Sequence, residues 1–368
     1  MRIEARTQVS ASAYALAALL AVGLPLLVSA ALVWWAGAPV APTWGLMLKG
    51  GFGSVFALSE TLTRAVPLML TGLAVAVAFQ ARLFNIGAEG QLYMGALAAV
   101  AVGGLHGGTG LELPPFVVFP LMMLAAALAG GLLLLGPALL KQQLGVDEVV
   151  TTLLLNFIVA LFISAMLDGP MKDPAAMGWP QSVALQGELE LAKLVPQTRI
   201  HSGLLMALTL AALVWLLMRR TVAGLQIRAV GANARAAAFV GVPVRRTVVV
   251  VALLSGALAG LAGALEVAGR ASYLTLDMSP GYGYTGIVIA MLAGLHPAGV
   301  VAASIFVAGV LVGADSMSRV AGVPSYLADV IVATSLLSVL VAGWLLQRRV
   351  VWRRPADRTF AKAKEAAP

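Results

Sequence analysis

The pattern of hydrophobic and polar positions divides the chain into long apolar runs separated by short polar segments. A helix needs about 20 mostly apolar residues to cross a bilayer. Because the runs are continuously apolar, they favour helices over the alternating strands of a membrane barrel. The candidate spans cover residues 13–36, 61–80, 86–106, 115–140, 149–167, 203–218, 247–268, 281–295, 298–314 and 325–346. The pattern predicts an all-α, polytopic helical membrane protein with about ten transmembrane helices.

Two of these regions have unusual features. The apolar run Ala13–Ala36 follows Arg2 and Arg6, as in a signal peptide. It is longer than a signal core of about 7–15 residues, so we interpret it as a retained first transmembrane helix. The stretch Met278–Ala314 contains no Asp, Glu, Lys or Arg and is long enough for two passes that turn at Gly294–Gly299. The first of these passes is short, which indicates a broken or re-entrant helix.

Composition narrows the class of protein. Apolar residues make up 60% of the chain and charged residues only 11%, whereas soluble domains carry about 25% charged residues. This excludes a soluble globular protein, and the high hydrophobicity argues against disorder. The net charge of +8 is explained by basic loops of a membrane protein, so we expect a lipid bilayer and no nucleic acid as partner.

The distribution of charge predicts the topology. Residues 219–246 contain six arginines and no acid, and the tail from 347 on contains seven bases; together they hold 13 of the 24 basic residues. The positive-inside rule places both segments in the cytoplasm. The segment 168–202 contains four acids, which suits the outside. An even number of spans, with the N- and C-termini cytoplasmic, satisfies all three placements.

No segment between spans is long enough to bury a core of its own. We therefore expect a single transmembrane domain over residues 1–346, followed by a basic cytoplasmic tail over 347–368. Within the domain, 219–246 is the cytoplasmic loop and 168–202 the external loop.

Recognisable catalytic and cofactor motifs are missing from the sequence. There is no cysteine, which excludes disulfides and Cys-ligated metals. There is no GxxxxGK[ST] phosphate-binding loop, no GxSxG and no HExxH. We expect no catalytic residues, no metal site and no cofactor bound by this chain.

Polar residues at membrane depth are the candidate solute path. The densest group is Asn85, Glu89 and Gln91 within residues 84–91. Asn85 is expected to cap the helix of the third span, with Glu89 in its first turn. This group is either a helix cap with small-residue packing or the polar lining of a water-filled path. Asn156 has the same two interpretations: an interhelical hydrogen bond or a contact in the path.

Three charged residues follow the seventh predicted span. Glu266, Arg270 and Asp277 either guard an opening or are solvated charges on the outer face. We favour the second interpretation, because exposed ion pairs contribute little.

The cytoplasmic loop contains a short predicted helix. Asn233 is a good N-cap, Ala234–Val240 is rich in alanine, and Gly241 with Pro243 beyond it stops the helix. A plain basic loop needs no such pattern, so we interpret it as a docking element for another protein.

Four segments together resemble a known family. They are residues 84–91, 145–156, 231–241 and 281–294, and the resemblance extends over about 55–346. The chain resembles the membrane permeases of ABC importers, in the subclass of branched-chain amino acid, ribose and nucleoside permeases. It looks most like the simple-sugar/nucleoside branch.

The resemblance implies a transport subunit without its own ATPase site, in a bacterial inner membrane. Its implied partners are ABC ATP-binding subunits, which hydrolyse ATP with Mg²⁺, a second related permease subunit and an external solute-binding protein. Two residues depart from the family: Ala234 replaces a common Pro, and Arg235 a usual acid. By resemblance, the ATPase-coupling residues are Gly231, Asn233, Arg235, Ala236, Ala237 and Gly241.

Other functions stay open at this point. The substrate is a nucleoside or simple sugar, or else a branched-chain amino acid. A secondary transporter driven by H⁺ or Na⁺, with Glu89 as the coupling carboxylate, is the alternative class of transporter. A membrane scaffold or enzyme is the third class.

Overall fold

The chain is described by a computed structural model that covers residues 2–5, 11–104, 113–322, 330, 333–335, 337–338, 341–345 and 348–351. Nearly all of this is helical, which confirms the predicted fold class. The described strands form one short antiparallel pair, β1 (Arg2–Ala5) with β2 (Arg348–Val351), and the remaining described residues lie in connections between helices. The helices are α1 (Ala11–Trp35), α2 (Val40–Phe52), α3 (Val55–Gln80), α4 (Ala88–Gly103), α5 (Pro115–Leu144), α6 (Glu148–Asp168), η1 (Gly187–Leu189), α7 (Gly203–Arg220), α8 (Val222–Ala232), α9 (Ala234–Phe239), α10 (Val244–Glu266), the π-helical η2 (Val267–Ala271), α11 (Tyr282–Leu292) and α12 (Pro297–Ala321).

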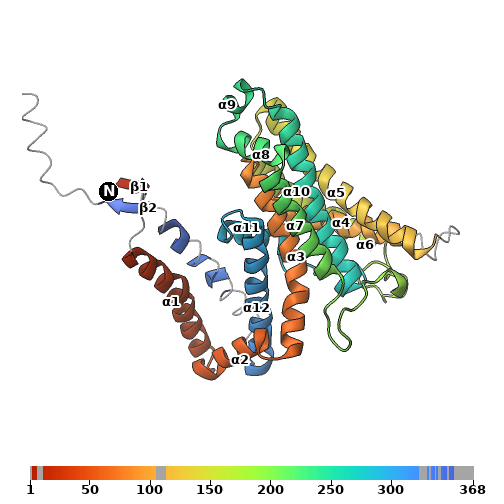
Figure 1. Cartoon of the computed structure of the whole chain (residues 1–368). Helices are drawn as coiled ribbons and strands as arrows, with labels where there is room; N and C mark the ends of the chain where they lie inside the picture. Colours follow the sequence, from red (N-terminus) through yellow and green to blue (C-terminus); the bar gives the residue numbers. More distant parts are fainter. Residues whose placement is uncertain are drawn as a thin grey trace, which may run out of the picture. The chain divides into compact units, whose positions relative to one another are not determined.

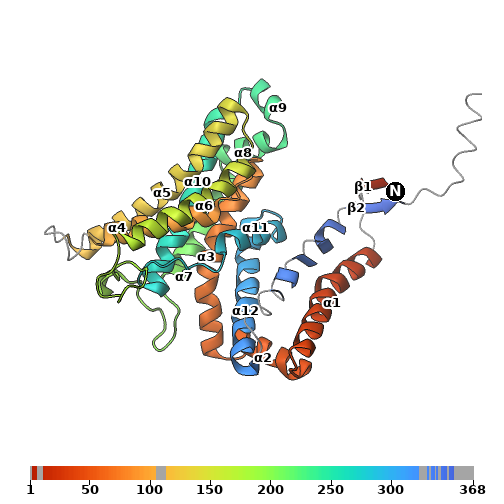
Figure 2. The ribbon, with the colours of Figure 1, turned by 180° about the vertical axis from the view of Figure 1, so that it is seen from behind.

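The chain divides into two compact units. One comprises residues 1–43 and 321–368 and includes α1 and the β1–β2 pair; the other comprises residues 44–320. Within the larger unit, α9 lies at one end and the loop that follows α6 lies toward the other, in both Figure 1 and the reverse view of Figure 2. We call these the α9 end and the loop end.

Six described helices are long and apolar enough to cross a membrane: α3, α5, α6, α7, α10 with η2, and α12. A seventh span results if the second half of α1 and α2 together form one bent span. The predicted spans at 86–106 and 281–295 correspond to α4 and α11, with 16 and 11 residues. The predicted span 325–346 and the tail 347–368 lie largely outside the described residues. Ten spans and cytoplasmic termini therefore stay predictions.

Helix boundaries follow local signals in the sequence. The Ser54 side chain accepts a hydrogen bond from the backbone N–H of Ala57 (3.0 Å) at the start of α3. Asp147 does the same for Val149 (2.8 Å) at the start of α6. Between them, α5 begins with Pro115 and ends at Leu144, followed by Gly145 as its C-cap, whose φ of +67° suits glycine.

The core of the larger unit is formed by α10 against α3, α4 and α5. Its closest contacts are between backbones: a Cβ on Gly130 of α5 would overlap the carbonyl oxygen of Gly256 of α10. A Cβ on Gly260 would likewise overlap the carbonyl of Ala126. Since lipid tails are as apolar as the side chains, such tight van der Waals packing is what holds membrane helices together.

The loop over residues 169–202 is folded onto the end of α10 and the residues after it. Backbone hydrogen bonds run from Leu191 N to Ala268 O (2.8 Å) and from Leu185 N to Ser272 O (2.7 Å). The loop end of the larger unit is therefore covered by ordered chain.

Candidate functional site

Residues 81–87 connect α3 to α4 without continuing either helix, and Asn85 is fully buried in this connection. Its Nδ2 donates to Oε1 of Gln91 (2.9 Å) and to Oγ of Ser255 in α10 (3.1 Å). Gln91 Nε2 in turn donates to Asn85 Oδ1 (2.8 Å). The two amides therefore form a reciprocal pair that fixes the connection against α10.

The expected capping role of Asn85 is wrong. The N-cap of α4 is Gly87, which has no capping side chain. Asn85 Oδ1 accepts from the N–H of Gly87 (3.0 Å), one residue before the helix begins. Tertiary partners from α4 and α10 compete successfully for the Asn85 side chain. The placement of Glu89 in the first turn is confirmed.

Asn156 joins the same junction from α6. Its Oδ1 accepts from Gly90 N (2.9 Å), and its Nδ2 donates to Ile86 O (3.0 Å) and Tyr284 Oη (3.1 Å). It therefore makes interhelical hydrogen bonds, which is one of the two expected uses of this residue.

Glu89 connects α4 to α11. Its Oε2 accepts a hydrogen bond from the backbone N–H of Gly283 (2.5 Å), in the first turn of α11. A Cβ on Gly283 would collide with the Glu89 backbone, so the two helix starts lie in direct contact. With 11 residues, α11 is too short to cross a bilayer alone, which agrees with the expected broken span.

Each of these polar residues has a hydrogen-bond partner in the described conformation. Asn85, Glu89, Gln91 and Asn156 are at most 8% exposed. Within the described part of the chain, the cavities discussed below are lined by other residues. The structure brings all four together as a buried junction, and their role in a solute path stays a prediction.

The second candidate site is α9 with its flanking residues. The Asn233 side chain accepts hydrogen bonds from the N–H groups of Arg235 (3.0 Å) and Ala236 (3.1 Å). At the other end, Gly241 has a φ of +89° and the helix closes through Val242 N to Ala237 O (2.9 Å). The predicted cap and stop are confirmed.

The six predicted coupling residues divide into two groups. Gly231 packs so closely that a Cβ would overlap the carbonyl oxygen of Gln80 in α3, and Ala237 is 3% exposed. These two hold the segment in place, and Asn233 and Gly241 terminate the helix. Arg235 and Ala236 are exposed and open to contact.

Sequence reasoning missed the most accessible apolar residues of this site. Phe239 is 94% exposed and Val240 is 74% exposed, at the tip of α9. The sequence signal was an apolar pair at the end of a short helix in an arginine-rich loop. A fully solvated loop does not favour apolar side chains at these positions.

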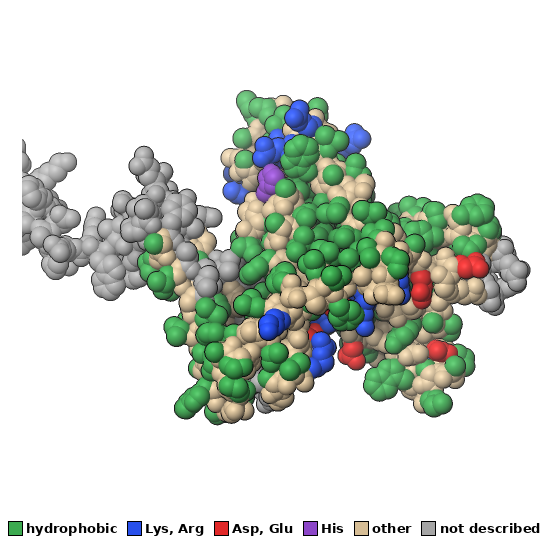
Figure 3. All heavy atoms as spheres, turned by 60° about the horizontal axis from the view of Figure 1, so that its bottom comes forward, with side chains coloured by type: hydrophobic (Ala, Val, Ile, Leu, Met, Phe, Trp, Pro, Cys, Tyr) green, Lys and Arg blue, Asp and Glu red, His purple; other side chains and the backbone are tan. Residues whose placement is uncertain are grey.

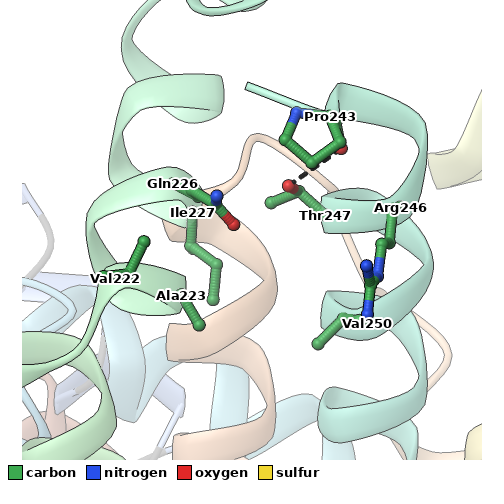
Figure 4. Close-up of a pocket in the computed structure, with 8 residues that line it drawn as sticks. All are labelled: Val222, Ala223, Gln226, Ile227, Pro243, Arg246, Thr247 and Val250. Atoms are coloured by element: carbon green, nitrogen blue, oxygen red, sulfur yellow. Dashed lines mark hydrogen bonds between the residues drawn. The ribbon is translucent and has the colours of Figure 1, made fainter. Parts of the chain in front are cut away.

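Two hollows flank α8 at the α9 end. One, of about 330 Å³, lies between α8 and the start of α10 (Figure 4). There the Thr247 hydroxyl donates to the carbonyl of Pro243 (3.0 Å), and Val222, Ala223, Gln226, Ile227, Arg246 and Val250 complete the lining. The other, of about 710 Å³, is lined in part by Arg82, Arg219 and Arg228. The α9 end thus offers apolar and basic groups to a partner surface.

Charged residues at the loop end form a third feature that sequence reasoning did not assemble. Arg64 lies inside the predicted span 61–80, and it pairs with Glu60 and Asp315. An ionisable residue inside a predicted span is itself the sequence signal for such a site.

The expectation that Glu266 is a solvated charge is wrong. Glu266 is 1% exposed and paired with Arg270, because the loop 169–202 covers this end of α10.

Six helices of membrane-spanning length among the described residues indicate a polytopic membrane protein. The chain belongs to the family of permease components of branched-chain amino acid transport systems, whose sequence model matches residues 57–342.

Three relatives span most of this chain. A guanosine ABC transporter permease of Bacillus subtilis is 35% identical, over 87% of this chain and 91% of that protein. A glucose ABC transporter permease of Haloferax volcanii is 37% identical, over 87% of each chain. A nucleoside ABC transporter permease of Lactococcus lactis is 27% identical, over 82% and 84%.

Among solved structures, the chain is similar to an inward-facing metal-chelate-type ABC transporter. The TM-score is 0.46 at 16% identity, over 91% of this chain and 100% of that one.

Proposed function

We propose that this chain is the membrane-spanning subunit of an ATP-driven importer and forms the path for nucleosides or simple sugars. The observation that carries the proposal is α9: a helix capped at both ends, exposed along its outer face and tipped by Phe239 and Val240. Relatives named for guanosine, glucose and nucleosides support the choice of substrate class.

In this proposal the α9 end faces the cytoplasm and the loop end faces outward, as the arginines of 219–246 favour. The Phe239 tip inserts into a groove of an ATP-binding subunit, which supplies ATP hydrolysis with Mg²⁺. A second related permease completes the path, and an external solute-binding protein delivers the substrate to the loop end. The assembly lies in the inner membrane of a bacterial cell.

The backbone contacts give a route for coupling. Gly231 touches the last turn of α3 at Gln80, and α10, which begins just after α9, packs on α3, α4 and α5. A push on α9 therefore acts on the helices that hold the Asn85–Gln91 junction. The spans then rock between outward-open and inward-open states, and Asn85, Glu89, Gln91 and Asn156 contact the solute when the junction opens.

The test is a charged substitution on the exposed face of α9. Ala236→Glu adds a carboxylate to a docking face without disturbing buried packing, so ATP-driven uptake of radiolabelled guanosine and glucose should be lost while membrane insertion is normal. The matched control is Ala236→Ser, which adds no charge and little volume at the same exposed position and should retain uptake. Normal uptake with Ala236→Glu would refute the coupling role of α9.

A further inference from the structure

A cavity of about 1000 Å³ lies at the loop end, entirely within the larger unit. It is bounded by α2, α3, α12, the loop 169–202 and η2. Figure 3 turns this end toward the reader and shows acidic and basic side chains gathered in a central hollow. The charged lining residues are Lys49, Glu60, Arg64, Arg199, Arg270 and Arg319.

Ion pairs connect the deepest of these residues. Arg64 Nε lies 3.5 Å from Glu60 Oε1, and Arg64 Nη1 lies 2.6 Å from Oδ2 of Asp315 on α12. Arg199 Nη1 donates to Glu60 Oε2 (3.1 Å). The Glu60 and Arg64 side chains are 10% and 14% exposed, and that of Arg199 is 57% exposed. The network therefore runs from the base of the cavity to its mouth.

The network includes residues of α3, a helix long and apolar enough to cross a membrane. Arg64 is nine residues beyond Val55, which places it ~13 Å along α3 at 1.5 Å per residue. Charged groups inside a span are costly, and they persist where they face a water-filled cavity or mark a solute path. Structural necessity does not explain this cluster, because apolar residues pack spans well without it.

The loop 169–202 positions Arg199 over α3. The Thr63 hydroxyl donates to the Arg199 carbonyl (2.9 Å), and the guanidinium lies 5.7 Å from the centroid of the Phe56 ring. The opposite wall carries Arg270, paired with the buried Glu266. Arg199 and Arg270 are thus held in fixed orientations around the cavity.

The charges select the class of ligand. Arg64, Arg199 and Arg270 are each paired with an acid, from the set Glu60, Asp315 and Glu266. Lys49 and Arg319 also line the cavity; they are exposed and give the lining an excess of positive charge. The three paired arginines present no unpaired charge, which favours a solute without net charge beside them. Each guanidinium has five N–H donors and each carboxylate about four acceptor sites, so ion pairing leaves donors and acceptors of both kinds free. Vicinal hydroxyl groups donate and accept at once, and the exposed Phe56 ring suits the apolar face of a sugar.

We propose that this cavity is the first site for the transported solute within the permease, and that it binds uncharged solutes through vicinal hydroxyls, such as a sugar ring or a ribose. This inference rests on the proposed function and names the residues that recognise the substrate.

The experiment uses the absence of native cysteine. Leu46, which lines the cavity, is replaced by Cys in the full chain, and labelling by a membrane-impermeant maleimide is measured from the outside. D-Glucose or D-ribose at about ten times its Kd should slow labelling ~10-fold, because the free fraction is 1/(1 + [L]/Kd). A control cysteine at Leu194, which lies in the loop 169–202 but outside the lining of the cavity, should be labelled equally with and without sugar.

Ring-matched solutes test the charge argument. D-Glucuronate and D-glucosamine, which add an anion or a cation to the same ring, should protect less than glucose. Adding Arg199→Gln should abolish protection, whereas Lys193→Gln, on the same loop, should preserve it. Stronger protection by glucuronate, equal protection with Arg199→Gln, or no labelling at Leu46→Cys would each overturn the proposal.

The two proposals fail separately. Protection by sugars without ATP-driven uptake would contradict the proposed function and leave the binding site standing. ATP-driven uptake without any protection would contradict the site alone.

Discussion

At the scale of single residues, Asn156 links α6 to the buried junction between α4 and α11. Replacing it by Ala leaves Gly90 N and Ile86 O, which it now satisfies, without their partner in a buried place. An unsatisfied buried group costs about 1–3 kcal/mol, so Asn156→Ala should lower thermal stability in detergent. Thr209→Ala removes a side-chain hydrogen bond at an exposed position of α7 and serves as the control. Equal melting temperatures for the two variants would contradict the role of Asn156.

His201 makes the loop 169–202 sensitive to pH. Burial lowers the pKa of His201 to about 4, and its Nδ1 accepts a hydrogen bond from Gly203 N (3.2 Å). The ring also lies where Cβ atoms on Gly203 and Gly269 would stand, so a protonated ring finds neither space nor solvent. An exposed His has a pKa of about 6.5. Because the unfolded loop binds the proton more readily, stability falls as pH drops from about 6.5 to about 4 and is constant above this window.

Hydrogen exchange of residues 185–202 between pH 4 and 7 measures this effect, after correction for the intrinsic rate. His201→Gln should show a flatter dependence than the parent protein, since it removes the titrating group. Parallel curves for the two proteins would assign the pH dependence to other groups.

Sequence reasoning at the residue scale succeeded where partners are local. Asn233 caps α9 because the N–H groups it satisfies lie two and three residues away. It failed for Asn85 and Glu266, whose surroundings are set by α10 and by the loop 169–202. No local pattern reveals a partner 170 residues away along the chain.

At the scale of elements, the packing of α5 on α10 depends on contact between backbones. Gly130→Ala places a methyl group against the carbonyl of Gly256, whereas Gly136→Ala, in the same helix, meets nothing within 4 Å. Alanine is favoured over glycine by about 1 kcal/mol in a helix. Thermal unfolding in detergent should therefore show Gly130→Ala destabilised and Gly136→Ala unchanged or stabilised. Equal effects of the two substitutions would contradict the close packing.

Most helices were predictable from the apolar pattern alone. The predicted spans 61–80, 115–140 and 149–167 correspond to α3, α5 and α6, since their length and hydrophobicity are strong local signals. The pattern missed α2 and α8, which are short and mix polar with apolar residues. The order of loop 169–202 was also missed, because it depends on backbone hydrogen bonds to residues after α10.

At the scale of the whole molecule, the two ends carry different chemistry. The α9 end presents an apolar tip among arginines, and the loop end encloses a cavity lined by ion-paired arginines. The proposed importer requires this asymmetry, because one end docks the ATP-binding subunit and the other end receives the solute. The sequence alone located the first end, through charge and capping. The cavity needed the fold, because it brings together α2, α3, α12 and a loop.

The central claim is that transport is driven by ATP hydrolysed on a partner docked at α9. The most direct measurement is uptake of radiolabelled guanosine and glucose in cells that carry the complete importer, under two treatments. Depletion of cellular ATP with the proton gradient maintained should stop uptake, and an uncoupler with ATP maintained should leave uptake unchanged. Uptake that survives the loss of ATP and collapses with the uncoupler would contradict the account and favour a secondary transporter coupled through Glu89.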